Sequence, residues 1–211
     1  FMKYRQLTIE EREQLQRQWC TATDWSAVEV VEDFVAEYVQ NVAFSGKVRL
    51  GRFERMFVQP GGFEVHSGIY YARLHNVTVG NDCYIDRIHN YIANYEIGND
   101  VFIENTNLIV VDGETAFGNG VRVPVMNEYG GREVPIYDHL SAHLAYILTL
   151  YRHDKKLIEV LERLIDEYVE KQKSEIGRIG NNVRIVNCGT IKNVRIGEYA
   201  TLGGVSKLKN G

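Results

Sequence analysis

Three histidines that could carry acid–base chemistry lie in one stretch of the chain, at His66, His75 and His89. An imidazole is well suited to take a proton from a hydroxyl or an amine near neutral pH. We therefore take all three as candidate catalytic residues. The alternative is that each one makes hydrogen bonds that hold a turn. The sequence separation of His75 and His89 does not place them on one face.

The segment 127–132 combines an amide, a carboxylate, two glycines and a guanidinium. Consecutive glycines let a ligand approach the backbone, and an arginine can hold a phosphate or a carboxylate through two hydrogen bonds. An equally supported alternative is a hairpin with strands at 121–126 and 133–137, with Glu128 and Arg132 as a surface ion pair. The candidate substrate-binding residues are Asn127, Glu128, Gly130, Gly131 and Arg132.

Other motifs that would define a reaction are absent from the sequence. There is no P-loop, no dinucleotide-binding glycine motif, no nucleophile elbow and no Cys–His nucleophile arrangement. His139 and His143 are spaced to share one face of a helix, but two ligands are too few, so we expect no metal site. Cys20, Cys83 and Cys188 show no CxxC spacing and are expected to be buried thiols.

The composition argues against several partners. The 211 residues carry a formal net charge of −4 with a pI near 5.9, which offers no basic field to nucleic acid. No apolar run approaches the roughly 18 residues needed to span a bilayer, and the first residues lack the apolar stretch of a secretion signal. The sequence thus predicts a cytoplasmic protein with no nucleic-acid or membrane partner.

Aliphatic side chains recur every five or six residues in three separate stretches. Such a period fits neither a helix nor a long strand, but it fits a chain that turns a corner after each short strand, three corners per lap. Stacked laps would bury the aliphatic column. The central stretch contains Ile69, Leu74, Val79, Ile85, Tyr91, Ile97, Ile103 and Ile109. The other two contain Phe34, Val39, Phe44 and Leu50, and Ile179, Ile185, Ile191, Ile196, Leu202 and Leu208.

Four tetrapeptides, at 79–82, 97–100, 179–182 and 196–199, repeat an aliphatic residue, a glycine and two further residues, mostly polar. Glycine and asparagine tolerate the positive φ that a sharp corner demands. The pattern predicts a mainly β fold, a parallel β-helix with an N-terminal capping helix and an inserted two-helix segment. The alternative is a mixed α/β domain with several Ile-Gly turns.

The Ile-Gly-Asn-x-Val hexapeptides resemble those of the hexapeptide-repeat transferase superfamily, which includes UDP-N-acetylglucosamine acyltransferase. The segments 66–69, 74–76 and 127–134 more closely resemble a family found mainly in Bacteroidetes, whose members are longer and carry no settled function. That likeness covers nearly the whole chain. The resemblance implies a left-handed β-helix, acetyl-CoA or a nucleotide sugar as the bound cofactor or substrate, and a homo-oligomer with a trimer as the expected form.

The repeat also predicts the organisation of the chain: a helical cap in 1–33, β-helix coils in 34–137, a helical insertion in 138–175 and further coils in 176–211. Thr8 and Glu11 predict a capping box for the first helix, and Asp154 is expected to cap the second inserted helix. No capping element follows the last coil. We therefore expect a fragment of a longer protein, or a partner that covers this end.

Two functions compete at this point. The first is a hexapeptide-type acyl- or nucleotidyl-transferase that acts on a sugar nucleotide or a related phosphorylated small molecule, with coil histidines close to Arg132. The second is a non-catalytic scaffold, ligand-binding or oligomerisation module. It predicts dispersed histidines and a Gly-Gly segment held by internal hydrogen bonds. A fold alone cannot choose between them, and the resemblance favours the first.

Overall fold

The computed structural model describes residues 3–125 and 129–211. Their contacts form two units. The first contains the residues up to Asp112 together with Ile176–Lys209, and the second contains Gly113–Glu175 with Asn210–Gly211. The sequence grouped 113–137 with the preceding strands, whereas their contacts are with the helices that follow.

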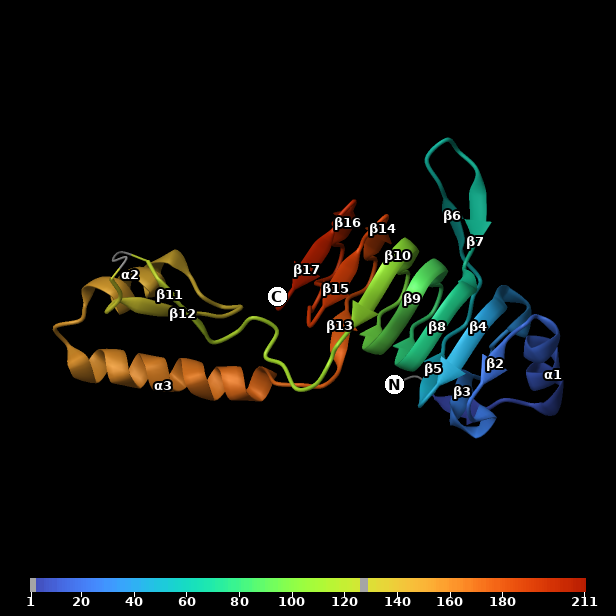
Figure 1. Ribbon diagram of the computed structural model, residues 1–211, viewed down its shortest axis with the longest axis horizontal. Helices are drawn as coiled ribbons and strands as arrows, with labels where there is room; N and C mark the ends of the chain where they lie inside the picture. The colour runs from blue at the N-terminus through green and yellow to red at the C-terminus, as the bar shows by residue number, and fades with distance from the viewer. Residues whose placement is uncertain (1–2, 126–128) are drawn as a thin grey trace. The chain divides into compact units, whose positions relative to one another are not determined.

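Within the described residues, the first unit is built on a 13-stranded sheet (Figure 1). Most neighbouring strands in it are parallel and come from successive stretches of the chain. The strands are β1 (Tyr4–Gln6), β2 (Thr21–Ala22), β3 (Val28–Val31), β4 (Val39–Ser45), β5 (Val48–Leu50), β8 (Gly68–Val79), β9 (Tyr84–Ile97), β10 (Phe102–Val110), β13 (Gly177–Ile179), β14 (Arg184–Val186), β15 (Thr190–Lys192), β16 (Thr201–Gly203) and β17 (Lys207–Lys209).

Equivalent aliphatic residues lie side by side across this sheet. Ile69 pairs with Ile85, Ile85 with Ile103, and Ile103 with Ile185. All four side chains are fully buried. Because side chains alternate along a strand, the residues directly before and after each of these isoleucines point outward. The five- or six-residue period therefore marks the core of the first unit.

The predicted fold class, a left-handed parallel β-helix, is corrected by the sheet topology. The sheet is mixed, because β1 runs antiparallel to β3 while the other strand pairs described in this sheet are parallel. Two further two-stranded sheets are antiparallel, and three α-helices accompany them among the described residues. A hydrophobic period reports which side chains are buried, but it does not fix the direction of the neighbouring strands, and this is why the sequence missed the mixed arrangement.

One position in the predicted core column is also wrong. Tyr91 is 38% exposed, and its neighbour Ile92 is fully buried in its place. Ile92 pairs with Leu74 on one side and with Ile109 on the other. The pairing of β9 with both neighbours contains a register shift, which moves the inward position by one residue.

The repeated tetrapeptides form corners between strands, but the residue with positive φ is not the one expected. The positive φ falls on the fourth residue, at Asp82 and Asp100 for example, and not on the glycine. The glycine is needed for space instead. A Cβ on Gly80 would lie 2.5 Å from the carbonyl oxygen of Gly98 on the neighbouring strand.

The hairpin of β6 (Met56–Val58) and β7 (Glu64–His66) projects from the first unit in Figure 1. Its Phe57 packs against two outward-facing aromatic rings of the sheet, Tyr84 and Phe102, which lie stacked at 4.7 Å. The hairpin thus covers an apolar strip that would otherwise face water.

Helix α1 (Ile9–Arg17) begins as predicted. The Thr8 hydroxyl accepts a hydrogen bond from the Glu11 backbone N–H, and the Glu11 carboxylate accepts one from the Thr8 N–H. Leu15 is the helix residue that is fully buried. The predicted capping box is therefore confirmed.

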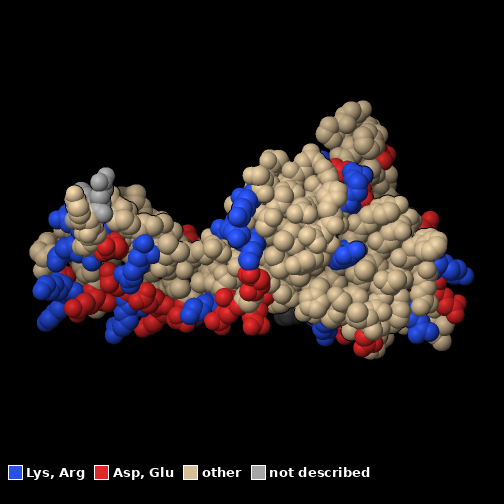
Figure 2. All heavy atoms as spheres, in the orientation of Figure 1, with Lys and Arg blue, Asp and Glu red and all other residues tan. Residues whose placement is uncertain are grey.

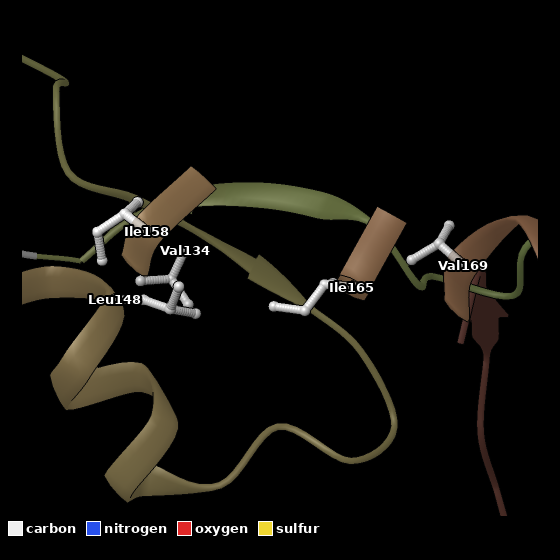
Figure 3. Packing of buried hydrophobic residues seen from close by; sticks show 5 residues of the cluster. All are labelled: Val134, Leu148, Ile158, Ile165 and Val169. Carbon is white, nitrogen blue, oxygen red and sulfur yellow. The ribbon is translucent and has the colours of Figure 1, made fainter. Parts of the chain in front are cut away.

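The second unit holds β11 (Val121–Pro124), β12 (Glu133–Ile136), α2 (Ala142–Leu150) and α3 (Lys155–Gln172). Asp154 caps α3 by accepting a hydrogen bond from the Leu157 N–H, as predicted. Figure 3 shows Val134, Leu148 and Ile158 pointing toward one another, with Ile165 and Val169 further along α3. These five side chains form the buried core of the unit.

No helix among the described residues is long and apolar enough to cross a membrane.

Candidate functional site

A groove of about 700 Å³ lies on an outward face of the first unit. Small side chains form part of its lining, including Ala43 on β4 and Ala93 on β9, two strands that both pair with β8. Larger side chains, Arg73, His75 and Tyr91, line it beside them. Figure 2 shows few charged side chains on the face over β4, β8, β9 and β10. A groove of this size can hold a ligand the size of a nucleotide.

Arg73 is the cation that lines this groove. Its side chain is exposed, and no ion pair or hydrogen bond of its guanidinium is found in the part of the chain that the structure describes. The acid in the lining, Asp112, is neutralised by Lys192 and also accepts a hydrogen bond from Asn193. Arg73 is therefore available to a ligand anion.

Arg73 also lines a smaller adjoining hollow of about 300 Å³. Two exposed aromatic residues, Trp19 and Tyr71, line that hollow together with His89. Trp19 is 80% exposed and Tyr71 is 61% exposed. Flat, accessible rings beside a free guanidinium are suited to a ligand that carries both a planar ring and a phosphate. We call the groove and this hollow together the Arg73 groove.

His75 lines the groove, but both of its ring nitrogens are occupied. The Asn76 side-chain oxygen accepts from the Lys47 N–H, so its amide nitrogen faces His75 Nε2 at 3.1 Å and donates to it. In the neutral ring, Nδ1 therefore carries the proton and donates to Ser45 Oγ at 2.8 Å. His75 in this state cannot take a proton from Ser45, so the pair is a structural contact rather than an activated nucleophile.

Among the described residues, His89 has a hydrogen-bond partner for Nε2 but none for Nδ1. The Asn105 amide nitrogen donates to Asn187 Oδ1, which turns its oxygen toward His89 Nε2 at 2.7 Å. Because that oxygen can only accept, Nε2 carries the proton and Nδ1 keeps its lone pair in the neutral ring. His89 is thus oriented by a neighbouring amide and lies in the same hollow as Arg73.

His66 lines a different hollow, of about 300 Å³, which we call the tyrosine pocket. Its lining residues are Val65, His66, Tyr70, Tyr71, Tyr84 and Asp86. His66 Nδ1 donates to the Ser67 carbonyl at 2.7 Å, and its ring stacks on Tyr38 at 3.6 Å. His75 and His89 therefore both line the Arg73 groove, whereas His66 lines a separate pocket, and Tyr71 is common to the hollows of His66 and His89.

The predicted substrate-binding block lies in the second unit. Asn127 and Glu128 are outside the described residues. The Gly131 N–H donates to Glu133 Oε1 at 2.8 Å, and this bond holds the pKa of the Glu133 carboxyl below its usual value. Gly130 and Gly131 both have positive φ, and β11 and β12 pair on either side of them. The backbone thus forms the hairpin of the alternative, and Arg132 is exposed; the expected Glu128–Arg132 ion pair lies outside the described residues.

The paired helical histidines are also corrected. His139 precedes α2, which begins at Ala142, so His139 and His143 do not share a helix face. His139 instead lies edge-on to the Tyr168 ring, with centroids 5.4 Å apart. Among the residues that the structure describes, no group of three or more potential metal ligands occurs.

The family described as Domain of unknown function (DUF4954) matches residues 4–211. The chain belongs to this family. The match covers both units and the whole of the Arg73 groove. No curated protein matches the DUF4954 chain. No solved structure matches it.

In this DUF4954 chain, Arg73, Trp19 and Tyr71 line the groove but were not predicted from the sequence. A signal for Arg73 exists in the repeat, since it directly precedes the core residue Leu74 and must point outward next to Ala43. No comparable signal exists for Trp19, because it follows the end of α1 and lies outside the repeat.

Proposed function

We propose that this chain binds a phosphorylated small molecule of the sugar-nucleotide or acyl-CoA class in the Arg73 groove. The observation that carries the proposal is Arg73, a guanidinium without a partner in the described part of the chain, in a groove of about 700 Å³. A bidentate hydrogen bond to phosphate would satisfy that guanidinium. Stacking on an exposed aromatic ring contributes about 1–3 kcal/mol for a nucleobase.

A thermal-shift screen tests this proposal. UDP-N-acetylglucosamine, UDP and acetyl-CoA are added to the wild type and to Arg73→Ala, with Arg12→Ala as a control that removes an exposed arginine from α1. We expect at least one ligand to raise the melting temperature of the wild type and of Arg12→Ala, because it binds the folded state. Arg73→Ala should lose most of that rise. Equal rises in all three proteins would contradict the proposal, as would no rise in any of them.

Group transfer is the second candidate function, and the state of His89 favours it. We propose that His89 Nδ1 takes the proton of an acceptor hydroxyl while the acceptor oxygen forms its bond to the transferred acyl or nucleotidyl group. The donor's thiolate or phosphate then leaves. A positioned general base of this kind raises a reaction rate roughly 10²–10⁴-fold.

Turnover of acetyl-CoA and UDP-sugars with sugar acceptors tests the second candidate. We expect His89→Ala to lose about 10²-fold or more in kcat. His75→Ala should change kcat far less, because both of its nitrogens hold structural contacts. Equal turnover by wild type and His89→Ala would exclude His89 as the base, and no turnover by the wild type would leave ligand binding without catalysis as the function.

We also propose that the protein is cytoplasmic and that it forms a homo-oligomer, with a trimer as the expected form. All three cysteines are free and buried, and free thiols are typical of a reducing compartment. The oligomer rests on the resemblance to hexapeptide-repeat transferases. Light scattering would test it against a monomer mass of 24.2 kDa. The net charge of −4 favours neither nucleic acid nor an anionic membrane as a partner.

A further inference from the structure

The tyrosine pocket contains three tyrosine rings, the His66 imidazole and a carboxylate in about 300 Å³. The rings of Tyr70 and Tyr84 lie 5.8 Å apart and are tilted by 49°. Tyr71 adds a third ring, which is 61% exposed. Asp86 is 6% exposed and lies among them. The faces of such rings carry negative electrostatic potential, so rings and carboxylate favour the same sign of ligand charge.

The hydrogen-bond donors of Tyr84, Tyr70 and His66 in this pocket are already used, and the exposed Tyr71 hydroxyl is a further donor of the lining. The Tyr84 hydroxyl donates to Asp86 Oδ2 at 3.2 Å, and the Tyr70 hydroxyl donates to the His66 carbonyl at 3.5 Å. The His66 Nδ1–H donates to the Ser67 carbonyl. What remains beside Asp86 are lone pairs on the Tyr70 and Tyr84 hydroxyl oxygens and on the imidazole, together with the carboxylate. A ligand group that reaches this carboxylate must therefore donate hydrogen bonds.

The carboxylate is only partly neutralised by the protein. Arg87 contacts Asp86 Oδ2 at 2.8 Å, but the same guanidinium also pairs with Glu104. One positive charge thus serves two carboxylates. Asp86 Oδ1 has no side-chain partner among the described residues. Burial raises the pKa of the Asp86 carboxyl despite Arg87, and burial likewise raises the pKa of Tyr70 to about 12.

We propose that the tyrosine pocket binds the primary ammonium group of a small organic molecule. The ammonium donates a hydrogen bond to Asp86 Oδ1, and its remaining protons face the tyrosine rings and hydroxyl oxygens. It supplies the positive charge that the Asp86–Arg87–Glu104 cluster lacks. A neutral alcohol of the same shape gains neither contribution. The site does not depend on the Arg73 groove, although Tyr71 lines both.

Titration with n-butylammonium chloride, followed by the tyrosine ring signals in NMR spectra, tests the proposal, with n-butanol as the uncharged comparison. We expect the wild type to bind butylammonium about tenfold more tightly than butanol, since about 1.4 kcal/mol separates them for a cation held by aromatic rings and a carboxylate. Asp86→Asn should abolish that preference. Asp33→Asn, an exposed acid paired with Arg52, is the matched control and should keep it.

Tyr71→Ala is a second variant that tests the proposal if Asp86→Asn does not fold. Tyr71 is exposed, so its loss should leave the melting temperature unchanged while weakening butylammonium binding about threefold. Equal affinity for butylammonium and butanol in the wild type would overturn the proposal, and so would unchanged binding in folded Asp86→Asn or in Tyr71→Ala. Arg73→Ala should bind butylammonium like the wild type, which separates this site from the phosphate groove.

Discussion

Burial controls the chemistry of the thiols at the scale of single residues. Cys83 is fully buried, and desolvation raises the pKa of its thiol to about 12. Cys20 is 3% exposed, and burial raises the pKa of its thiol to about 11. Since the thiolate is the reactive form, both groups are inert at neutral pH in the folded protein. Neither cysteine is a candidate nucleophile.

Thiol labelling checks this prediction. With a disulfide reagent at pH 8, folded protein should react at Cys20 and Cys83 far more slowly than protein unfolded in guanidinium, because reaction requires an opening of the fold. Mass spectrometry of labelled peptides assigns the sites. Rapid labelling of Cys83 in the folded protein would show that its surroundings are more open than described.

The histidines show what sequence can predict at this scale. Their residue type identified His66, His75 and His89 as candidates, but the roles of the His75 and His89 nitrogens depend in part on residues that are distant in sequence. His75 is held by Ser45, and His89 is held by Asn105. Arg73 was not predicted because its relevant property is a guanidinium without a partner within the described residues. The repeat indicates that Arg73 points outward, but a sequence does not show which charged groups are paired.

At the scale of elements, a ladder of asparagine side chains joins successive corners of the first unit. Asn81 Oδ1 accepts from the Arg52 N–H, Asn99 Oδ1 accepts from the Asn81 N–H, and Asn181 Oδ1 accepts from the Asn99 N–H. Each bond satisfies a backbone donor at a corner, where the strand pairing ends. The glycine before each asparagine allows the strands to approach.

Gly80→Ala tests that close approach. The new Cβ would lie 2.5 Å from the Gly98 carbonyl oxygen, and backbone cannot move away cheaply, so we expect a loss of about 1–3 kcal/mol in the free energy of unfolding. Gly197→Ala is the matched control, since nothing lies within 4 Å of its Cβ, and it should change stability by less than about 0.5 kcal/mol. Urea denaturation compares the two. Equal effects would contradict the role assigned to Gly80.

Elements were partly predictable from the sequence. The capping box at Thr8 and the cap at Asp154 were identified correctly, since a cap is a local pattern. The corner glycines were placed correctly, but for the wrong reason, because their role comes from a neighbouring strand and not from their own φ. Tyr91 was assigned to the core, since a register shift between strands leaves no mark on the period.

At the scale of the whole molecule, the chain consists of two units with separate cores. The first unit buries the aliphatic column, and the second buries Val134, Leu148, Ile158, Ile165 and Val169. The sequence predicted the aliphatic column and the two inserted helices. It did not predict the mixed sheet or the inclusion of 113–137 with the helices, because both depend on contacts between segments that follow different patterns.

Leu148→Ala tests the separation of the cores. Leu148 is fully buried, and truncating such a leucine costs about 2–5 kcal/mol. We expect amide hydrogen exchange to accelerate in α2 and α3 and to remain unchanged in β8, β9 and β10. Faster exchange throughout the chain would show instead that the two units unfold together.

The central claim is that the Arg73 groove binds a phosphorylated ligand, and chemical-shift mapping of the ¹⁵N-labelled protein with UDP-N-acetylglucosamine tests it most directly. We expect shifts at the groove amides, including Ala43, Arg73 and Ala93, and their loss in Arg73→Ala. Shifts confined to Gly130, Gly131 and Arg132 in the second unit, or no shifts at all, would contradict it.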